Sequence, residues 1–176
     1  RSITFPARFM LVAAMNPCPC GYLTDRSRAC RCTPNAVHRY LAKISGPLLD
    51  RIDVHVEIPA VPLHALTQPS DGESSATIKQ RVLKARAIQR KRLKSAKVFS
   101  NAQMSHRDLT KFCPLSPEAK TLLHAALQEL CFSARAHDKI LRIARTIADL
   151  AGSEAIQPDH LAEAIQYRSL DRQLWT

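Results

Sequence analysis

Hydrophobic residues near the start of the chain form two short runs with different patterns. Residues 9–15 are apolar without interruption and end at Asn16 and Pro17. Such a run is typical of a strand covered on both faces, as in the middle of a parallel sheet, although a buried helix segment gives the same pattern. Residues 52–58 alternate between Ile or Val and polar residues, which predicts a strand with one packed face.

A loop and a helix are expected between these two strands. Residues 17–33 are rich in proline and polar residues and predict the loop. The Thr-Pro pair at 33–34 matches an N-cap and a first helical position, and apolar residues then continue at helical spacing to Ile44. The Gly-Pro pair at 46–47 is expected to stop this helix before a turn that leads into the second strand.

Beyond residue 61 the pattern changes to helices alone. Residues 62–75 are rich in proline and serine and predict a linker. The fold class is therefore α/β over residues 1–61, followed by an all-α domain over residues 76–176. Helices are predicted over residues 76–95 and 105–111, from Ser116-Pro117 onward, from Ser133 to Gly152, and from Pro158 onward.

Charge adds a candidate partner to this picture. The 176 residues carry a formal net charge of +11, and this favours nucleic acid or acidic partners, although a merely soluble basic protein has the same charge. The helix at 76–95 is rich in basic residues and contains no acidic residue and no aromatic residue that could stack on a nucleobase. It therefore predicts contact with phosphates without recognition of the nucleobases, or else a solvated helix face. Its basic residues are Lys79, Arg81, Lys84, Arg86, Arg90, Lys91, Arg92 and Lys94, of which Lys79, Arg86, Arg90 and Lys94 are the candidate DNA contacts.

The sequence predicts a cytoplasmic protein. No apolar run approaches the roughly 20 residues that span a bilayer, and no signal peptide is visible. The chain has six cysteines, which in a reducing compartment favour metal or redox chemistry over disulfides. It begins with Arg1 rather than Met, so we expect it to be part of a longer protein.

Four of the cysteines form two Cys-x-Cys pairs in the predicted loop. Two pairs can supply the four thiolates that a structural zinc ion prefers, although the usual spacing is Cys-x2-Cys. Arg26, Arg28 and Arg31 would offset the negative charge of such a site. The alternative is a set of free, reduced cysteines, or disulfides formed after purification. The candidate ligands are Cys18, Cys20, Cys30 and Cys32, whereas Cys113 and Cys131 are expected to be buried thiols.

Several short motifs resemble AAA+ ATPases of the magnesium-chelatase class. They are Pro6-Ala7-Arg8-Phe9, Asn16-Pro17 and Leu48-Leu49-Asp50-Arg51-Ile52-Asp53. The cysteine insertion and the segments Ser133–Ala136 and Ala144–Leu150 resemble the YifB/ComM-type branch, which is associated with DNA. The resemblance implies the C-terminal part of an AAA+ nucleotide-binding domain followed by a helical lid.

The same resemblance assigns roles to three residues. It implies that Asn16 is the sensor that holds a water or a γ-phosphate oxygen, although Asn before Pro also simply closes a strand. It implies that Arg51 is an arginine finger acting on a neighbouring subunit, unless it pairs with an adjacent Asp. Arg135 is the implied nucleotide-contacting arginine of the lid, with Arg142 and Arg145 as alternatives and a solvated arginine as the simpler interpretation.

The implied parent protein is a ring, expected to be hexameric, that couples hydrolysis of ATP with Mg²⁺ to DNA movement in branch migration during natural transformation. Glycine occurs only at 21, 46, 72 and 152, so no glycine-rich phosphate loop is present and we expect these residues alone to be inactive. Two alternatives stay open: a magnesium-chelatase motor subunit acting on a protein partner, and a zinc-containing nucleic-acid-binding module.

Overall fold

The computed structural model describes residues 2–5, 7, 9–25, 27–59, 61, 72–129 and 133–168. The chain divides into two compact units, Arg1–Ile44 and Ser45–Thr176, which are treated separately below. The expected linker at 62–75 lies mostly outside the described residues. Pro6, Arg8 and Cys131 lie outside them as well.

The first unit contains one helix, α1 (Pro34–Leu41), among its described residues. Thr33 is its N-cap, and the Thr33 hydroxyl accepts a hydrogen bond from the Ala36 amide at 3.3 Å. This N-cap and the Pro at the first position confirm the sequence prediction for the start of the helix. The helix ends at Leu41, a few residues before the expected Ile44.

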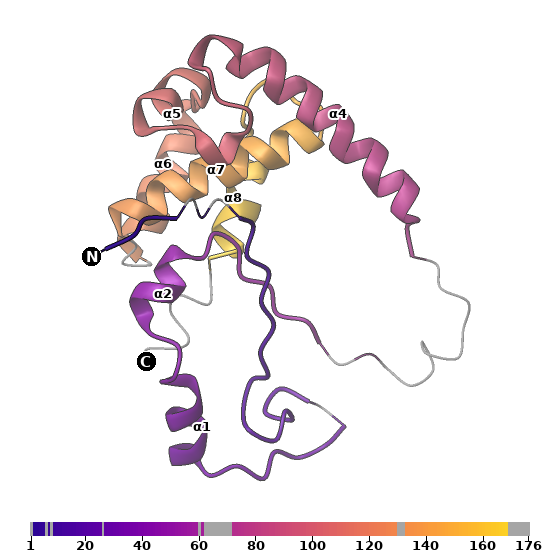
Figure 1. Ribbon diagram of the computed structural model, residues 1–176, viewed down its shortest axis with the longest axis vertical. Coiled ribbons are helices and arrows are strands. Elements are labelled where there is room, and N and C mark those ends of the chain that lie inside the picture. Colours follow the sequence, from indigo (N-terminus) through magenta and orange to yellow (C-terminus); the bar gives the residue numbers. More distant parts are fainter. Residues whose placement is uncertain are drawn as a thin grey trace. The chain divides into compact units, whose positions relative to one another are not determined.

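The predicted strand at residues 9–15 is wrong for the described chain. The segment is extended but pairs with no other described strand, and Met10 and Val12 are 87% and 82% exposed. Figure 1 shows it as a plain trace without an arrow. A strand needs hydrogen bonds from a neighbour, and the described residues provide none here. Local sequence therefore indicated an extended backbone but could not supply its partner.

The second predicted strand, residues 52–58 in the second unit, is also wrong in the described chain. Val56 and Ile58 are exposed, whereas His55 from the polar set is buried. The His55 amide donates to the Tyr167 carbonyl at 2.8 Å, and the Ile52 carbonyl accepts from Lys139 at 3.2 Å and from Arg168. These contacts, rather than pairing with a neighbouring strand, hold the segment.

The turn predicted at 47–50 is a short helix, α2 (Gly46–Arg51). The Gly-Pro pair at 46–47 begins this helix rather than only ending the previous one, because proline's fixed φ suits the first helical turn. Backbone amides of Leu48 and Leu49 donate to the Ser45 carbonyl at 3.0 and 3.1 Å. Arg51 is consequently placed at the end of a helix.

The helices expected after residue 75 are confirmed. Serine side chains cap four of them: Ser74 begins α4, Ser105 forms a capping box with Asp108 at α5, Ser116 accepts from the Ala119 amide at 3.2 Å at the start of α6, and Ser133 begins α7. Gly152, at φ +70°, follows the end of α7, a backbone conformation that favours glycine. The helices are α4 (Ser75–Leu93), α5 (His106–Phe112), α6 (Pro117–Glu129), α7 (Ala134–Leu150) and α8 (Pro158–Gln166), with short 3-10 turns η1 (Lys94–Ala96) and η2 (Asn101–Gln103).

The core of the second unit lies around α7. Ala144 and Ala148 of α7 and Ala164 of α8 are fully buried, and their small side chains let the helices approach closely. Larger apolar residues, among them Ile140 and Leu161, fill the spaces between the helices. In Figure 1, α7 lies among α5, α6 and α8. Within the described ranges, none of the helices combines the length and the hydropathy needed to cross a bilayer.

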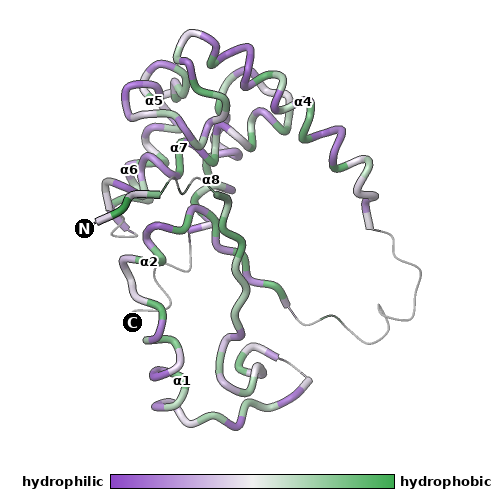
Figure 2. Tube along the Cα trace, in the orientation of Figure 1, coloured by the Kyte–Doolittle hydropathy of each residue, from purple (hydrophilic) through white to green (hydrophobic). Residues whose placement is uncertain are grey.

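Helix α4 is packed along only part of its length. Its buried residues, Ala85, Gln89 and Leu93, all lie in the C-terminal half. Ile78 and Val82, which lie at helical spacing before Ala85, are 42% and 44% exposed. Figure 1 shows the N-terminal half extending past the other helices, and Figure 2 shows polar and apolar residues interleaved along it. The apolar face predicted for this helix is thus buried only near its C-terminal end.

Candidate functional site

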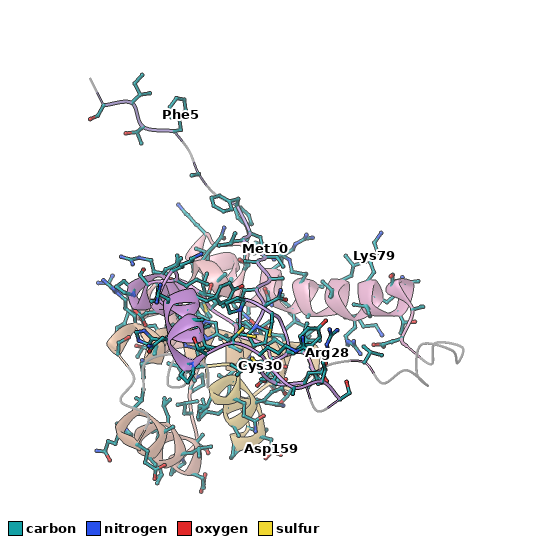
Figure 3. The ribbon with its side chains drawn as sticks, turned by 90° about the horizontal axis from the view of Figure 1, so that it is seen from below. Phe5, Met10, Arg28, Cys30, Lys79 and Asp159 are labelled. Carbon is teal, nitrogen blue, oxygen red and sulfur yellow. The ribbon has the colours of Figure 1, made fainter. Side chains whose placement is uncertain are left out.

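The four loop cysteines lie together in the first unit. The Sγ atom of Cys18 lies 3.4 Å from that of Cys20 and 3.7 Å from that of Cys30, and Cys20 and Cys30 are 3.6 Å apart. With Cys32, all four sulfurs lie within 4.8 Å of one another. Figure 3 shows sulfur atoms gathered near Cys30. The fold therefore brings the two Cys-x-Cys pairs into one cluster.

This cluster matches the size of a tetrahedral zinc site. A Zn–S bond of about 2.3 Å places tetrahedral sulfurs about 3.8 Å apart. The three closest sulfur distances, 3.4, 3.7 and 3.6 Å, are slightly shorter than that. The residues present therefore fit a structural zinc ion, which when bound would supply four bonds that tie the loop together.

The backbone of the loop favours thiolate chemistry at one cysteine in particular. Amide hydrogen bonds from Tyr22 and Arg31 lower the pKa of Cys20 to about 6, so it is ionised at neutral pH. At Cys30 the amide of Cys32, which lies 3.4 Å from its sulfur, acts to lower the pKa. Desolvation and the neighbouring thiols outweigh that effect and raise the pKa of Cys30.

Cys32 is the least acidic of the shifted thiols. An amide hydrogen bond from Cys20 acts to lower its pKa, but desolvation and the adjacent thiols raise it to about 12. Without a metal ion, the cluster cannot hold four thiolates side by side, because negative charges at such short distances repel one another. A cation at the centre removes that opposition, so metal binding and release of the remaining protons occur together.

The arginines expected to offset the thiolate charge behave differently from the prediction. Arg28 donates to the Tyr22 hydroxyl at 2.8 Å, and its guanidinium lies 4.3 Å from the centre of the same ring. At Arg31 it is the backbone amide that assists Cys20. Arg26 lies outside the described residues. The negative charge of the thiolates is thus stabilised mainly by backbone amide donors. A sequence pattern does not reveal such donors.

Asn16 is exposed and lies directly before the cysteine loop. Gly21 faces its side chain: a Cβ at Gly21 would lie 3.8 Å from both Cγ and Nδ2 of Asn16. The carboxamide is therefore exposed and lies close to the loop at Gly21.

A second group of candidate residues forms in the second unit where α2 meets the start of α7. Asp50 of α2 accepts a hydrogen bond from the Ser133 hydroxyl at 3.1 Å and lies 3.8 Å from Arg135 and 3.6 Å from Arg168. Ser133 also caps α7. Asp50 therefore fixes α2 against the first turn of α7. No local pattern marks Asp50 for this role, because its partners Ser133, Arg135 and Arg168 are distant in sequence.

The two candidate arginines of this junction are both exposed. Arg51 donates to the Pro47 carbonyl of its own turn at 2.7 Å. The acidic neighbours expected to compete for it are engaged elsewhere, Asp50 as above and Asp53 with Lys139 at 3.2 Å. Arg135 is 69% exposed, and its guanidinium lies 3.8 Å from Asp50. Both arginine side chains thus face solvent.

The alternatives to Arg135 are used inside the helical domain. Arg142 donates to the Met104 carbonyl through Nε and Nη2 at 3.1 and 2.8 Å. Arg145 is almost fully buried and donates to the Ser153 and Glu154 carbonyls at 2.6 and 2.8 Å. These contacts give both arginines a structural role. Of the three candidates, Arg135 is therefore the one whose guanidinium faces solvent.

Arg145 belongs to a buried polar network that the sequence did not indicate. Asp149 lies 3.0 Å from Arg145 and 2.6 Å from Arg92 of α4. Asn101 donates to the Thr146 hydroxyl at 3.0 Å and to Asp149 at 2.9 Å. The available signal was an Arg and an Asp four residues apart within an apolar helix stripe.

This network corrects the prediction for one basic residue of α4. Arg92 was counted on the basic face, but it points inward to Asp149 and Asn101. Arg81 is bound to Glu73 at 2.7 Å. Lys79, Arg86, Arg90 and Lys94 are all exposed, and Figure 3 shows Lys79 pointing away from the helix. At about 100° per residue, the first three lie within roughly 40° of one another.

Comparison with known proteins places the chain in a family. The family model described as magnesium chelatase, subunit ChlI, matches residues 1–66, and the one described as magnesium chelatase, subunit ChlI C-terminal, matches residues 72–168. The protein YifB of Salmonella typhimurium is 44% identical over 98% of the chain. Competence protein ComM of Haemophilus influenzae and YifB of Escherichia coli are 43% and 46% identical over the same share.

The chain spans about a third of the length of these relatives, 33% in each case. The C-terminal family model alone covers more than half of the chain, and it corresponds to the helical unit built on α4 to α8. The chain therefore belongs to the magnesium chelatase subunit ChlI family, alongside the YifB and ComM proteins.

Proposed function

We propose that this chain is the C-terminal part of a ring-forming, ATP-driven DNA motor of the AAA+ class. The observation that carries the proposal is the α2–α7 junction, where Asp50 anchors the start of α7 and leaves Arg51 and Arg135 facing solvent. The name of the Haemophilus influenzae relative, a competence protein, points to DNA as the material moved. The magnesium-chelatase motor acting on a protein partner is the alternative.

In the proposed mechanism, Arg51 neutralises charge that develops on the γ-phosphate held by a neighbouring subunit. A guanidinium suits this task because it is always charged and offers several donors in one plane. Arg135, exposed at the same junction, contacts the nucleotide. Asn16 orients a water or a phosphate oxygen with its carboxamide. The phosphate loop and the Mg²⁺ site would be supplied by the rest of the protein.

The test of this proposal uses the full-length protein. Arg51→Ala should lower ATP hydrolysis by about 10³-fold or more while ATP binding is nearly retained, because a finger in trans acts on transition-state charge. Mixing it with a variant defective in the phosphate loop should restore part of the activity, since one kind of interface then holds both intact parts. Arg142→Ala is the contrasting variant: its contacts to the Met104 carbonyl predict a loss of stability instead.

Two further roles belong to the same proposal. Helix α4 contacts DNA phosphates through Lys79, Arg86, Arg90 and Lys94, supported by their exposure. The cysteine cluster binds one structural zinc ion, supported by its sulfur geometry. A stand-alone zinc-containing nucleic-acid module would show the same two features, and loss of hydrolysis in the full-length Arg51→Ala protein would exclude it.

A further inference from the structure

The metal cluster and Asn16 are joined by one tight turn of the backbone. The Gly21 amide donates to the Cys18 carbonyl at 3.0 Å and closes a turn that contains Cys20. Gly21 has a φ of +82°, a left-handed conformation that disfavours any side chain. On the far side of this turn, Gly21 lies beside the Asn16 carboxamide, with room between them for a Cβ at an ordinary contact distance of 3.8 Å. The residues that would bind a metal are thus neighbours of Asn16, whose side chain is exposed.

Little besides the sulfurs holds this turn in place. Among the described residues of the first unit, Cys18 alone is both apolar and buried. The loop has hydrogen bonds within short turns, such as the Asp25 amide to the Tyr22 carbonyl at 3.2 Å. Weak contacts between thiols contribute little, whereas four metal–sulfur bonds contribute strongly to folding. The position of Gly21 therefore depends on whether the cluster holds a cation.

We propose that metal binding by the four cysteines positions Asn16, so that a zinc-like cation controls the group that orients the attacking water. The inference rests on the proposed function only for what Asn16 does once it is positioned. Without the cation, the turn relaxes and the exposed carboxamide rotates freely. With the cation, Gly21 restricts the carboxamide from one side, which pre-organises it for the phosphate. Metal supply then regulates hydrolysis without any contact between metal and nucleotide.

The positioning step can be tested on the 176-residue chain by NMR. The side-chain NH₂ resonances of Asn16 are assigned by their loss in Asn16→Asp, and reduced, metal-free protein is titrated with zinc chloride. We expect the Asn16 pair to shift in step with zinc up to one equivalent and its hydrogen exchange to slow. The NH₂ pair of Asn101, held in the lid by Thr146 and Asp149, is the internal reference and should not move.

Two cysteine variants separate the cluster from general effects. Cys20→Ser removes a ligand and should abolish the zinc response of Asn16, whereas Cys113→Ser, a buried thiol of the helical unit, should preserve it. Thiolate-to-Co²⁺ absorption measures binding independently. Tetrahedral Co²⁺ binding by the wild-type chain with no shift of the Asn16 pair would overturn the proposal, and so would the absence of metal binding.

Activity of the full-length protein distinguishes the two levels of the argument. If the Asn16 resonances respond to the metal but Asn16→Ala hydrolyses ATP like the wild type, metal-dependent positioning is supported and the catalytic role of Asn16 is wrong. If Asn16→Ala loses hydrolysis but the Asn16 resonances do not respond to the metal, only the positioning is wrong. If both hold, Cys20→Ser should lower hydrolysis, and adding it to Asn16→Ala should cause no further loss, because the two changes then act through one group.

Discussion

At the scale of single residues, Asp149 is the centre of the buried polar network in the helical unit. Its carboxylate is fully buried and receives Arg92 from α4, Arg145 from its own helix and Asn101 from η2. Removing one member of such a set leaves the other charges buried without compensation. Three segments that are distant in sequence therefore depend on one side chain.

The first prediction follows from that dependence. Asp149→Ala should lower the free energy of unfolding by about 3–5 kcal/mol, because both arginines keep their charge in a buried site. Urea titration followed by circular dichroism measures the change. Glu163→Ala is the matched control: its carboxylate is exposed and accepts a hydrogen bond from Tyr167 at 3.0 Å, so its loss should change stability little. A small effect of Asp149→Ala would contradict the structural role of the network.

The buried and partly buried charged residues also show which contacts the sequence could not predict. Asp149 and Arg145 lie among alanines and isoleucines of a helix stripe, and a charged pair in such a stripe gives no hint of a partner on α4. Asp50 was hidden in the same way, because its three partners come from the distant segments around Ser133 and Arg168. Long-range polar contacts of this kind are set by packing, which no local spacing encodes.

At the scale of elements, the cysteine loop leads to a prediction about metal and pH. The purified, reduced chain should bind about one zinc ion through four thiolates. Because Cys30 and Cys32 have raised pKa values, the latter about 12, both must lose protons on binding. Affinity should therefore rise with pH through neutrality, by at least about a hundredfold per pH unit, because at least these two protons are released.

Competition with a chromophoric chelator at two pH values measures that slope. Cys113→Ser should leave both stoichiometry and slope unchanged, since its buried thiol lies in the other unit. Chelation should loosen the loop while the helices of the second unit stay folded, and circular dichroism at 222 nm follows the helices. Less than a tenth of an equivalent of metal would instead favour free thiols.

Helix α4 gives a prediction about DNA. If Lys79, Arg86, Arg90 and Lys94 contact phosphates, log affinity for duplex DNA should fall with log salt at a slope of roughly −3 to −4, irrespective of sequence. Replacing Arg86, Arg90 and Lys94 by Glu should flatten the slope and weaken binding. All three side chains are exposed, so the domain should stay folded.

The matched control for this helix is a reversal at a residue with an internal partner. Arg81→Glu removes the same charge from α4, but Arg81 is bound to Glu73 and faces another side of the helix. It should weaken binding less than any one of the three. Equal affinities of the wild type and the triple variant at two salt concentrations would end the case for DNA contact by α4.

The same elements explain why helices were predictable and strands were not. The starts of α4, α5 and α7 are marked by serine caps and their lengths by apolar spacing, and both signals are local. Residues 9–15 and 52–58 have strand-like patterns, but a strand exists only beside another strand. The described chain gives them none, and so their strand-like patterns are accompanied by an extended backbone without strand pairing.

At the scale of the whole molecule, the sequence leads to a prediction about catalysis. The 176 residues contain glycine only at positions 21, 46, 72 and 152, so they include no glycine-rich phosphate loop. The purified chain should show no ATP hydrolysis and very weak ATP binding. Isothermal titration and a phosphate-release assay test this, with the full-length protein as the positive control. Robust magnesium-dependent turnover by the chain alone would contradict its assignment as one part of an ATPase.

The clamp between Arg92 and Asp149 has a mechanical consequence. Helix α4 is a rod of 19 residues, about 28 Å long, and it is gripped near one end only, where Arg92 meets the last turns of α7. The opposite end of α7 holds Arg135. Because α4 is packed on α7, a tilt of about 4° at that contact would displace the free end of α4 by about 2 Å, given its length of about 28 Å. The unburied half of α4 would therefore move farther than the buried half in any such tilt.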